Sequence, residues 1–259
     1  MSPRFPILLY HRIGGRDGSF MDKYTVTPET FKLQMDWIKQ HNWRPIALED
    51  ISTEISRKSA GRFLVITFDD GFASNRIHAW PVLDRNGFPS ATFIVGGMLG
   101  QHNSWDGSGR DCYTLLSSED LAFSNSRLMA FQSHSATHPK LTALGPNALS
   151  EEITKSKRFA QILHPSGSFF AYPFGALNRA VMAEIRGAGF SGGCTCYQGL
   201  NSKRTNPFLL RRVEIRENDL GWRLWLKLYT GRDLLSKPSW LSELRVWLHT
   251  KLRHRNRCY

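Results

Sequence analysis

The sequence predicts an α/β fold in which strands alternate with helices and form a parallel sheet or barrel. Three observations support this prediction. Short runs of apolar and β-branched residues recur along the chain, such as 64–68 between Gly61 and Gly71. Amphipathic segments of helical length lie between these runs, which is the order expected of βαβ units. Polar side chains directly follow several runs, where α/β proteins gather their chemistry at the carboxyl ends of strands.

The predicted elements can be placed in chain order. Strands are predicted at residues 6–10, 44–48, 64–68, 91–95, 128–133, 168–174, 190–195 and 209–215. Helices are predicted at residues 28–41, 48–55, 73–86, 146–163 and 178–186, with another beginning near residue 117. Thr27 is a suitable helix cap before Pro28, whereas Pro81 should kink or split the helix that contains it.

The charge of the chain is unevenly distributed. The net charge is +12 over 259 residues, and residues 211–259 hold 12 Lys or Arg against 5 Asp or Glu, which gives +7. A basic tail favours an anionic partner such as a phospholipid, a lipid-linked sugar phosphate or a nucleic acid. A solvated basic face without any partner is the alternative.

The sequence offers no targeting segment and no disulfide framework. The N-terminal residues contain no long apolar core, and no window holds the roughly 20 apolar residues of a membrane span. The cysteines have neither metal-knuckle spacing nor a paired framework; they are Cys112, Cys194, Cys196 and Cys258. A cytoplasmic location is therefore expected by default.

Two clusters of polar residues follow apolar runs and indicate a metal site. Asp69 and Asp70 end one run, and the segment from His134 to His138 follows another. Alone, Asp-Asp-Gly is often a turn and a His pair is often structural. Together, Asp70, His134 and His138 can hold a divalent metal with an open position, and Asp69 can act as general base beside it. The His-x-x-x-His spacing puts both rings on one side if a helical turn begins near His134.

Three segments carry a resemblance to a known family. They are Thr67-Phe-Asp-Asp-Gly71, His134-Ser-Ala-Thr-His-Pro139 and Phe170-Ala-Tyr-Pro-Phe-Gly175. In order and spacing they resemble the first three motifs of the polysaccharide deacetylases, the NodB-like carbohydrate esterase family 4. The resemblance covers about residues 5 to 216. The opening Leu9-Tyr-His-Arg-Ile13 and residues 27–48 are similar to the branch that includes poly-N-acetylglucosamine deacetylases.

The resemblance implies a distorted (β/α) barrel of seven or eight strands that hydrolyses an N-acetyl group on a sugar with the help of a metal. It implies that Asp69 is the base and that Asp70, His134 and His138 are the ligands, with Zn²⁺ expected and Co²⁺ or Ni²⁺ also used in the family. The substrate and its oxyanion would meet the turn formed by Tyr172, Pro173 and Phe174, where a backbone N–H is the donor. Phe174 replaces the family's usual Tyr.

Two residues of the family pattern are missing from this sequence, and other residues are expected to take over their roles. Ala171 stands where many members have an Arg that pairs with the base, and Arg212 is the expected replacement because a cation lowers the pKa of Asp69. The late Leu-x-His motif, whose His is the general acid, is absent. His11 is the expected acid by similarity to the poly-N-acetylglucosamine branch, and a packed histidine at a strand end is the alternative.

Residues 1–216 are thus predicted to form the catalytic domain and residues 217–259 a basic, Trp-rich helical extension. The extension contains four of the eight tryptophans, Trp222, Trp225, Trp240 and Trp247. Its leucine stripe is Leu241, Leu244, Leu248 and Leu252, and basic residues lie around the stripe: Arg245, Lys251, Arg253, Arg255 and Arg257. An ordinary helix capping the barrel is one interpretation. A basic amphipathic helix on the inner membrane surface is the other. A nucleic-acid partner is not expected, because no nucleic-acid module accompanies the charge.

The expected function is a metal-dependent N-deacetylase that acts on an amino sugar in a polysaccharide, an oligosaccharide or a lipid-linked glycan of the cell envelope. Two alternatives stay open. The chain could be a deformylase or amidase on another sugar or cyclic amide, because the mechanism is indifferent to the acyl group. It could also be a catalytically weak accessory protein that binds glycan or membrane.

Overall fold

The structure is a computed structural model, which describes residues 4–57, 61–106, 112–122, 124, 128–163 and 169–233. In these residues a curved parallel sheet follows the order β10-β1-β5-β6-β7-β8-β9, with β4 pairing β5 beside this path. The strands are β1 (Ile7–Tyr10), β4 (Arg44–Pro45), β5 (Phe63–Phe68), β6 (Ser90–Ile94), β7 (Met129–Ser133), β8 (Phe169–Ala171), β9 (Gly192–Cys194) and β10 (Val213–Glu214). The predicted α/β barrel is confirmed.

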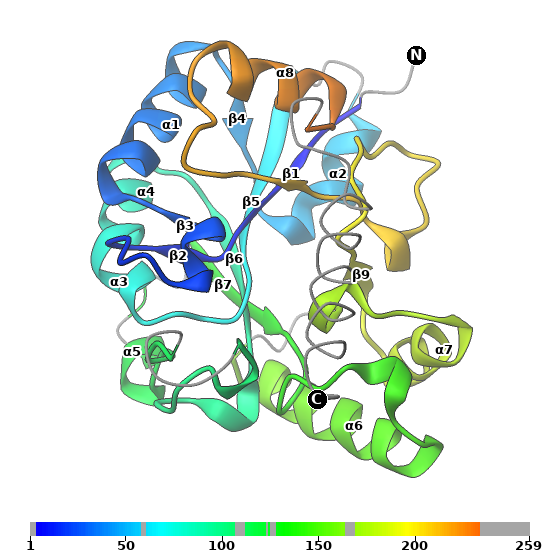
Figure 1. Ribbon diagram of the computed structural model, residues 1–259. Helices are drawn as coiled ribbons and strands as arrows, with labels where there is room; N and C mark the ends of the chain where they lie inside the picture. Colours follow the sequence, from blue (N-terminus) through cyan, green and yellow to red (C-terminus); the bar gives the residue numbers. More distant parts are fainter. Residues whose placement is uncertain are drawn as a thin grey trace, which may run out of the picture.

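Helices surround the outside of this sheet (Figure 1). They are α1 (Pro28–Gln40), α2 (Ile51–Ser56), α3 (Ser74–His78), α4 (Trp80–Asn86), α5 (Ser118–Ala122), α6 (Pro146–Leu163), α7 (Arg179–Gly187) and α8 (Trp222–Thr230). Short 3₁₀ turns are η1 (Phe20–Lys23), η2 (Leu48–Asp50), η3 (Gly96–Met98), η4 (Ser104–Asp106), η6 (Leu141–Ala143), η7 (Pro173–Gly175) and η8 (Pro207–Leu209). A small parallel pair, β2 (Arg12–Ile13) and β3 (Thr25–Val26), lies beside the main sheet.

The barrel closes through a segment that the sequence predicts as one strand. Leu210 bonds on one side to β9, where its N–H donates to the Gly193 carbonyl over 2.9 Å and its carbonyl accepts from Thr195 N over 2.8 Å. Three residues later, Val213 of β10 pairs with Leu8 of β1. The segment therefore links the last strand to the first, and it carries Arg212 into the interior of the barrel.

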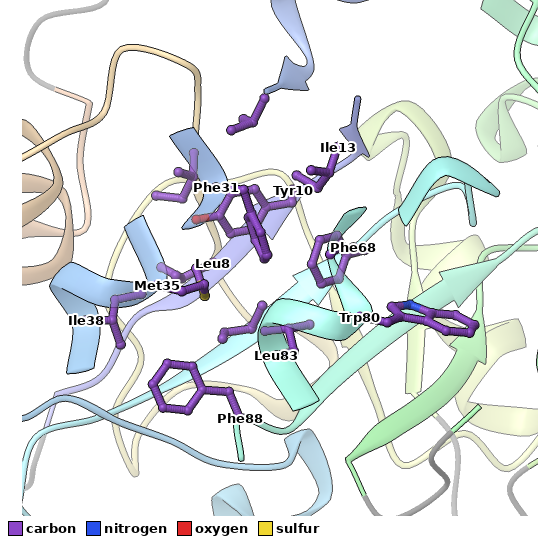
Figure 2. Close-up of a cluster of buried hydrophobic side chains, with 14 of the residues drawn as sticks. Leu8, Tyr10, Ile13, Phe31, Met35, Ile38, Phe68, Trp80, Leu83 and Phe88 are labelled. Atoms are coloured by element: carbon purple, nitrogen blue, oxygen red, sulfur yellow. The ribbon is translucent and has the colours of Figure 1, made fainter. Parts of the chain in front are cut away.

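Two hydrophobic clusters lie on the two faces of the sheet. Leu8 and Tyr10 of β1 belong to the outer cluster, in which Phe31 and other residues of α1 cover them (Figure 2). The inner cluster fills the barrel and includes Val65 and Phe93. Because side chains alternate along a strand, the inward residues 63 and 65 of β5 place Asp69 on the inner face as well.

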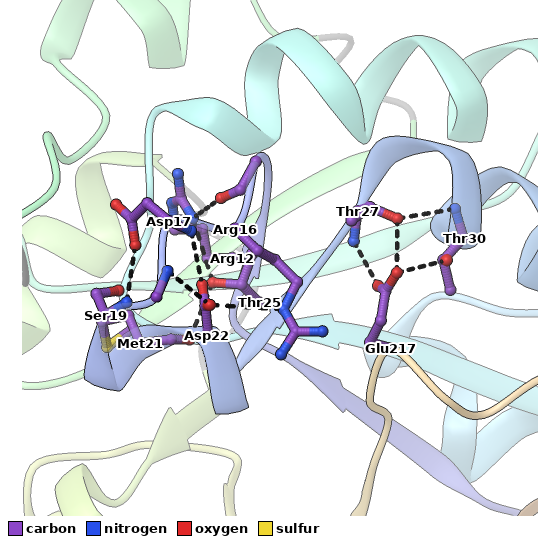
Figure 3. A network of polar contacts seen from close by, with 12 residues as sticks. Arg12, Arg16, Asp17, Ser19, Met21, Asp22, Thr25, Thr27, Thr30 and Glu217 are labelled. Carbon is purple, nitrogen blue, oxygen red and sulfur yellow. Dashed lines mark hydrogen bonds and ion pairs between the residues drawn. The ribbon is translucent and has the colours of Figure 1, made fainter.

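The helix predicted at residues 73–86 is split. It forms α3 and α4, which meet at Ala79, and Pro81 lies at the start of α4 where its missing N–H costs nothing. Thr27 is the N-cap of α1, as expected, and Glu217 provides a second cap at the same end of the helix. The Glu217 carboxylate accepts from Thr27 N over 2.7 Å and from the Thr30 hydroxyl over 2.9 Å (Figure 3).

Residues 217–233, the first part of the predicted extension, pack against the preceding residues of the barrel. Leu224 and Leu228 of α8 join the outer hydrophobic cluster. Lys227 is buried, and its ammonium lies 2.6 Å from the Asp219 carboxylate and 3.1 Å from that of Asp233. The leucine stripe at 241–252 lies outside the described residues, so membrane association stays a prediction. In the part of the chain that the structure describes, each helix is too short or too polar to cross a membrane.

Candidate active site

The carboxyl end of β5 delivers a carboxylate that is locked to a buried arginine. The Asp69 side chain accepts two parallel hydrogen bonds from Arg212, at 2.6 Å from Nη1 to Oδ1 and 2.7 Å from Nη2 to Oδ2. Arg212 is 1% exposed, and its Nε donates to the Thr195 carbonyl over 3.0 Å. This bidentate geometry fixes the orientation of the Asp69 carboxylate.

The same pair determines the charge of Asp69. Burial by itself would raise the pKa of Asp69, but the Arg212 guanidinium and then His134 lower it more. The resulting pKa lies below the ordinary value, so the carboxylate is ionised throughout the neutral range. The pKa of Arg212 is raised, because the attraction of Asp69 outweighs the cost of burial. Asp69 is therefore a charged group able to accept a proton.

Three side chains beside Asp69 bring their donor atoms to one point. Asp70 Oδ1 lies 3.3 Å from His134 Nε2 and 3.4 Å from His138 Nε2, and the two imidazole nitrogens are 3.2 Å apart. All three residues are buried. Ligands at about 2.0–2.1 Å from a tetrahedral zinc ion are about 3.3 Å from one another. The spacing of the three donor atoms therefore fits the residues that would hold a tetrahedral metal ion.

The two histidines reach this point through a strained turn and not through a helix. Ser135 and His138 have φ angles of 67° and 61°, which lie in the left-handed region that few non-glycine residues adopt. The Ser135 hydroxyl accepts from His138 N over 2.9 Å. The expected helical turn at His134 is therefore wrong, although both rings do converge. Asp70 also has a positive φ, 69°, which turns its side chain out of the strand direction.

Hydrogen bonds and burial set the protonation of the ligands. His134 Nδ1 lies 2.9 Å from the Ala171 carbonyl, so the proton belongs on Nδ1 and the lone pair on Nε2 is free for a metal. Burial lowers the pKa of His138 and keeps its imidazole neutral, as a ligand must be. The pKa of His134 is raised, because Asp69 and Asp70 outweigh burial. Burial opposes ionisation of Asp70, but the adjacent imidazoles of His134 and His138 hold its pKa far below the ordinary range.

A cavity of about 300 Å³ opens over these groups. Among the residues that line it are His11, Met21, Tyr24, Asp69, Asp70, Trp105, Asp106, His134, His138, Tyr172, Phe174, Cys196, Gln198, Arg212 and Glu214. The structure thus brings almost every residue proposed from the sequence to one cavity. A base, a candidate metal site and aromatic walls make it suitable for hydrolysis of a sugar derivative.

Comparison with known proteins settles the family. The polysaccharide deacetylase family profile matches residues 56–193, which is more than half of the chain. The chain belongs to the polysaccharide deacetylase family. It is 25% identical over 215 residues to the putative polysaccharide deacetylase YxkH of Bacillus subtilis, covering 82% of this chain and 71% of that protein. It is 22% identical over 240 residues to the poly-β-1,6-N-acetyl-D-glucosamine N-deacetylase of Staphylococcus aureus, covering 82% and 78%.

Solved structures share the fold. The Streptococcus pyogenes deacetylase PplD, in complex with acetate, superposes with a TM-score of 0.74 at 21% identity and covers 88% of this chain and 99% of PplD. IcaB from Ammonifex degensii superposes with a TM-score of 0.71 at 20% identity and covers 84% and 94%. The deacetylase barrel predicted from the motifs is therefore the fold of this chain, which is a carbohydrate deacetylase by family.

In this deacetylase His11 lies at the cavity, and its surroundings hold it in place. Fully buried Asn75 of α3 donates to the His11 carbonyl over 2.7 Å and accepts from Ile13 N over 2.7 Å. The His11 ring contacts the Tyr24 ring at a centroid distance of 4.8 Å. Burial raises the pKa of Tyr24 to about 12, so its hydroxyl stays protonated. The ring of His11 is thus supported on one side and accessible from the cavity.

The turn of the third motif borders the cavity on the opposite side. The Tyr172 hydroxyl donates to the Phe208 carbonyl over 2.9 Å, which ties it to the barrel wall. Pro173 is buried, whereas Phe174 is exposed and has a φ of 56°. The Phe174 ring lies 4.6 Å from the His138 ring. The exposed Phe174 ring therefore forms part of the cavity wall next to the candidate ligand His138.

Several residues of the site were not predicted from the sequence. Trp105 stacks on His138 with ring centroids 4.2 Å apart, and Asp106 follows it at the cavity. Both belong to the Gly-, Ser- and Asp-rich segment 99–114, for which no strand or helix is predicted, and its aromatic residues Trp105 and Tyr113 are the only available signal. Glu152 of α6 and Asn75 of α3 hydrogen-bond the backbone of segments that carry site residues. Their roles depend on tertiary contacts that no local pattern reveals.

Proposed function

We propose that the protein is a metal-dependent N-deacetylase, with zinc as its metal, that removes the N-acetyl group from an amino sugar in a glycan. The observation that carries this proposal is the triangle of Asp70, His134 and His138 beside an ionised Asp69. The match to a poly-N-acetylglucosamine N-deacetylase supports the choice of an amino sugar. A polysaccharide, an oligosaccharide and a lipid-linked glycan all remain within the proposal.

The residues of the chain divide the chemistry between them. When bound, a divalent cation polarises the acyl carbonyl and lowers the pKa of the attacking water. Asp69 accepts the proton of that water, and Arg212 keeps its carboxylate charged and oriented towards the cavity. The backbone N–H of the Pro173-Phe174 turn is the proposed donor to the oxyanion that develops on the carbonyl oxygen of the acyl group.

His11 is the proposed general acid for the leaving amine. Replacing His11 with alanine should lower kcat about 10²–10⁴-fold, because the amine must then leave unprotonated. The measurement is acetate release at saturating substrate, with metal content and unfolding temperature recorded for each variant. His41→Ala is the matched control. His41 is exposed, directly follows the last residue of α1 and stacks on Trp37. Near-normal turnover of His11→Ala would refute the general-acid role and show that His11 is a packed histidine at a strand end.

A substrate screen tests the reaction itself. The metal-loaded protein should release acetate from N-acetylglucosamine oligomers, and Asp69→Asn should give the blank because an amide cannot accept the proton. Formate release from N-formyl sugars without acetate release would indicate the deformylase. A protein that binds metal and glycan yet releases neither acid would be the accessory protein, and the proposal would then be wrong.

A further inference from the structure

The turn that carries both histidine ligands is held from behind by one carboxylate of α6. Glu152 Oε1 accepts from Ala136 N over 2.8 Å and from Thr137 N over 2.6 Å. Its second oxygen, Oε2, accepts from the Thr137 hydroxyl over 3.1 Å. Glu152 is 9% exposed and does not line the cavity. It therefore acts on the turn and cannot touch substrate directly.

The turn needs such support because its backbone is unfavourable. Ser135 and His138 both have a positive φ, which non-glycine residues adopt only where the surroundings enforce it. The N–H groups of Ala136, which is buried, and of Thr137, which is exposed, would lose their acceptor if Glu152 were absent. A single carboxylate thus satisfies two backbone donors in the middle of the strained turn.

The other side of the turn is fixed by η3. Gly96 N donates to the Ser135 carbonyl over 3.1 Å and Gly97 N to the Ala136 carbonyl over 2.8 Å. A Cβ added to Gly97 would lie 2.7 Å from the Ala136 carbonyl oxygen, so the backbones are in close contact. The turn is therefore held between η3 and α6. Ser156 adds a second link from α6, since its hydroxyl hydrogen-bonds that of Ser133 at the end of β7.

His138 depends on this support more than His134 does. His134 has its own anchor through Nδ1 and the Ala171 carbonyl, whereas His138 Nδ1 has no hydrogen-bond partner among the described residues. Apart from its contacts with Asp70 and His134 in the donor triangle, the ring of His138 is held by packing against Trp105 and Phe174 and by the backbone that carries it. A shift of the turn would therefore move His138 away from the other two ligands.

We propose that Glu152 is a positioning residue for the metal centre, which sets metal affinity by holding the turn that brings His138 Nε2 to Asp70 and His134. This inference rests on the proposed metal site. Outer partners of metal ligands typically contribute 10–100-fold to metal affinity. Glu152 does so through the backbone of the turn, because it contacts neither ligand side chain.

Zinc affinity of the apoprotein, measured by competition with a chromogenic chelator, tests the role of Glu152. Glu152→Ala should bind Zn²⁺ about 10–100-fold more weakly than the wild type. Glu152→Gln should restore most of the affinity, because its amide oxygen can still accept from both N–H groups. The visible spectrum of the Co²⁺ form should change in Glu152→Ala and return in Glu152→Gln. Unchanged affinity and an unchanged spectrum in Glu152→Ala would overturn the proposal.

Asn75 supplies the matched control. Asn75 is also buried on a helix and also bonds the backbone of a site segment, but that segment carries His11 and no metal donor. Asn75→Ala should therefore leave the Zn²⁺ affinity at the wild-type value, and an equal loss in both variants would assign the effect to general loosening of the barrel. If Glu152→Ala does not fold, Glu152→Asp takes its place, because its shorter side chain cannot reach both donors. A wild type that binds no metal would instead refute the proposed function.

Discussion

Replacing Asp70 with alanine is expected to abolish both tight metal binding and deacetylation. The substitution removes the anionic member of the donor triangle and leaves two neutral imidazoles 3.2 Å apart. Two neutral ligands cannot compensate the charge of a divalent cation in a buried site. Metal affinity should fall by more than the roughly 10–100-fold expected from losing an outer partner.

Metal analysis of the purified variants and acetate release, measured on the same samples, give the test for Asp70. Chelation of the wild type should reproduce the loss of activity, and added Zn²⁺ should reverse it. Asp69→Asn is the informative control, because it should keep the metal and lose only turnover. Full activity of Asp70→Ala, or of thoroughly chelated wild-type protein, would contradict a metal-dependent reaction.

The parts of the site that follow from local pattern could be predicted from the sequence. The run at 64–68 has the composition of a buried strand, and β5 begins only one residue earlier. Strand alternation predicts that Asp69 faces the inside of the barrel, where it meets Arg212, whereas the positive φ of Asp70 turns its side chain towards the histidines. The sequence thus predicts different tasks for the two carboxylates, and the structure supplies the backbone turn and the distances.

Geometry that depends on distant residues could not be predicted in the same way. Arg212 was expected as the cation beside Asp69 from the departure of the sequence from the family pattern, and the structure has that pair; local pattern could not show the contact, because it spans 143 residues and depends on how segment 210–214 closes the barrel. The His134–His138 spacing is compatible with a helical turn, and only the bonds from Glu152 and η3 make the strained turn preferable. The place of Trp105 in the site could not be predicted for the same reason, because its stacking partner His138 comes from another segment.

Arg212→Met is expected to shift the acidic limb of the pH–rate profile to higher pH, by about 1–3 units. In the wild type the guanidinium is the main influence that lowers the pKa of Asp69, and without it only the smaller attraction of His134 and His11 opposes the effect of burial. Asp69 must be ionised to accept a proton, so a raised pKa removes activity at low pH first. Acetate release measured from pH 5 to 9 gives the shift, and Arg212→Lys should move the limb less because it keeps the charge.

Arg212→Met should also lower the stability of the folded protein, and the pH dependence of this loss should show whether the lost ion pair is its cause. Because the folded-state pKa of Asp69 lies below the unfolded value, the pair contributes stability above the unfolded pKa and loses it as pH falls. At pH 7 Arg212→Met should therefore cost about 3–5 kcal/mol, since it leaves a buried carboxylate without its partner. The cost should shrink towards acidic pH, and Asp69→Asn combined with Arg212→Met should recover part of it. A cost independent of pH, together with an unmoved rate profile, would mean that Arg212 only fills space behind the base.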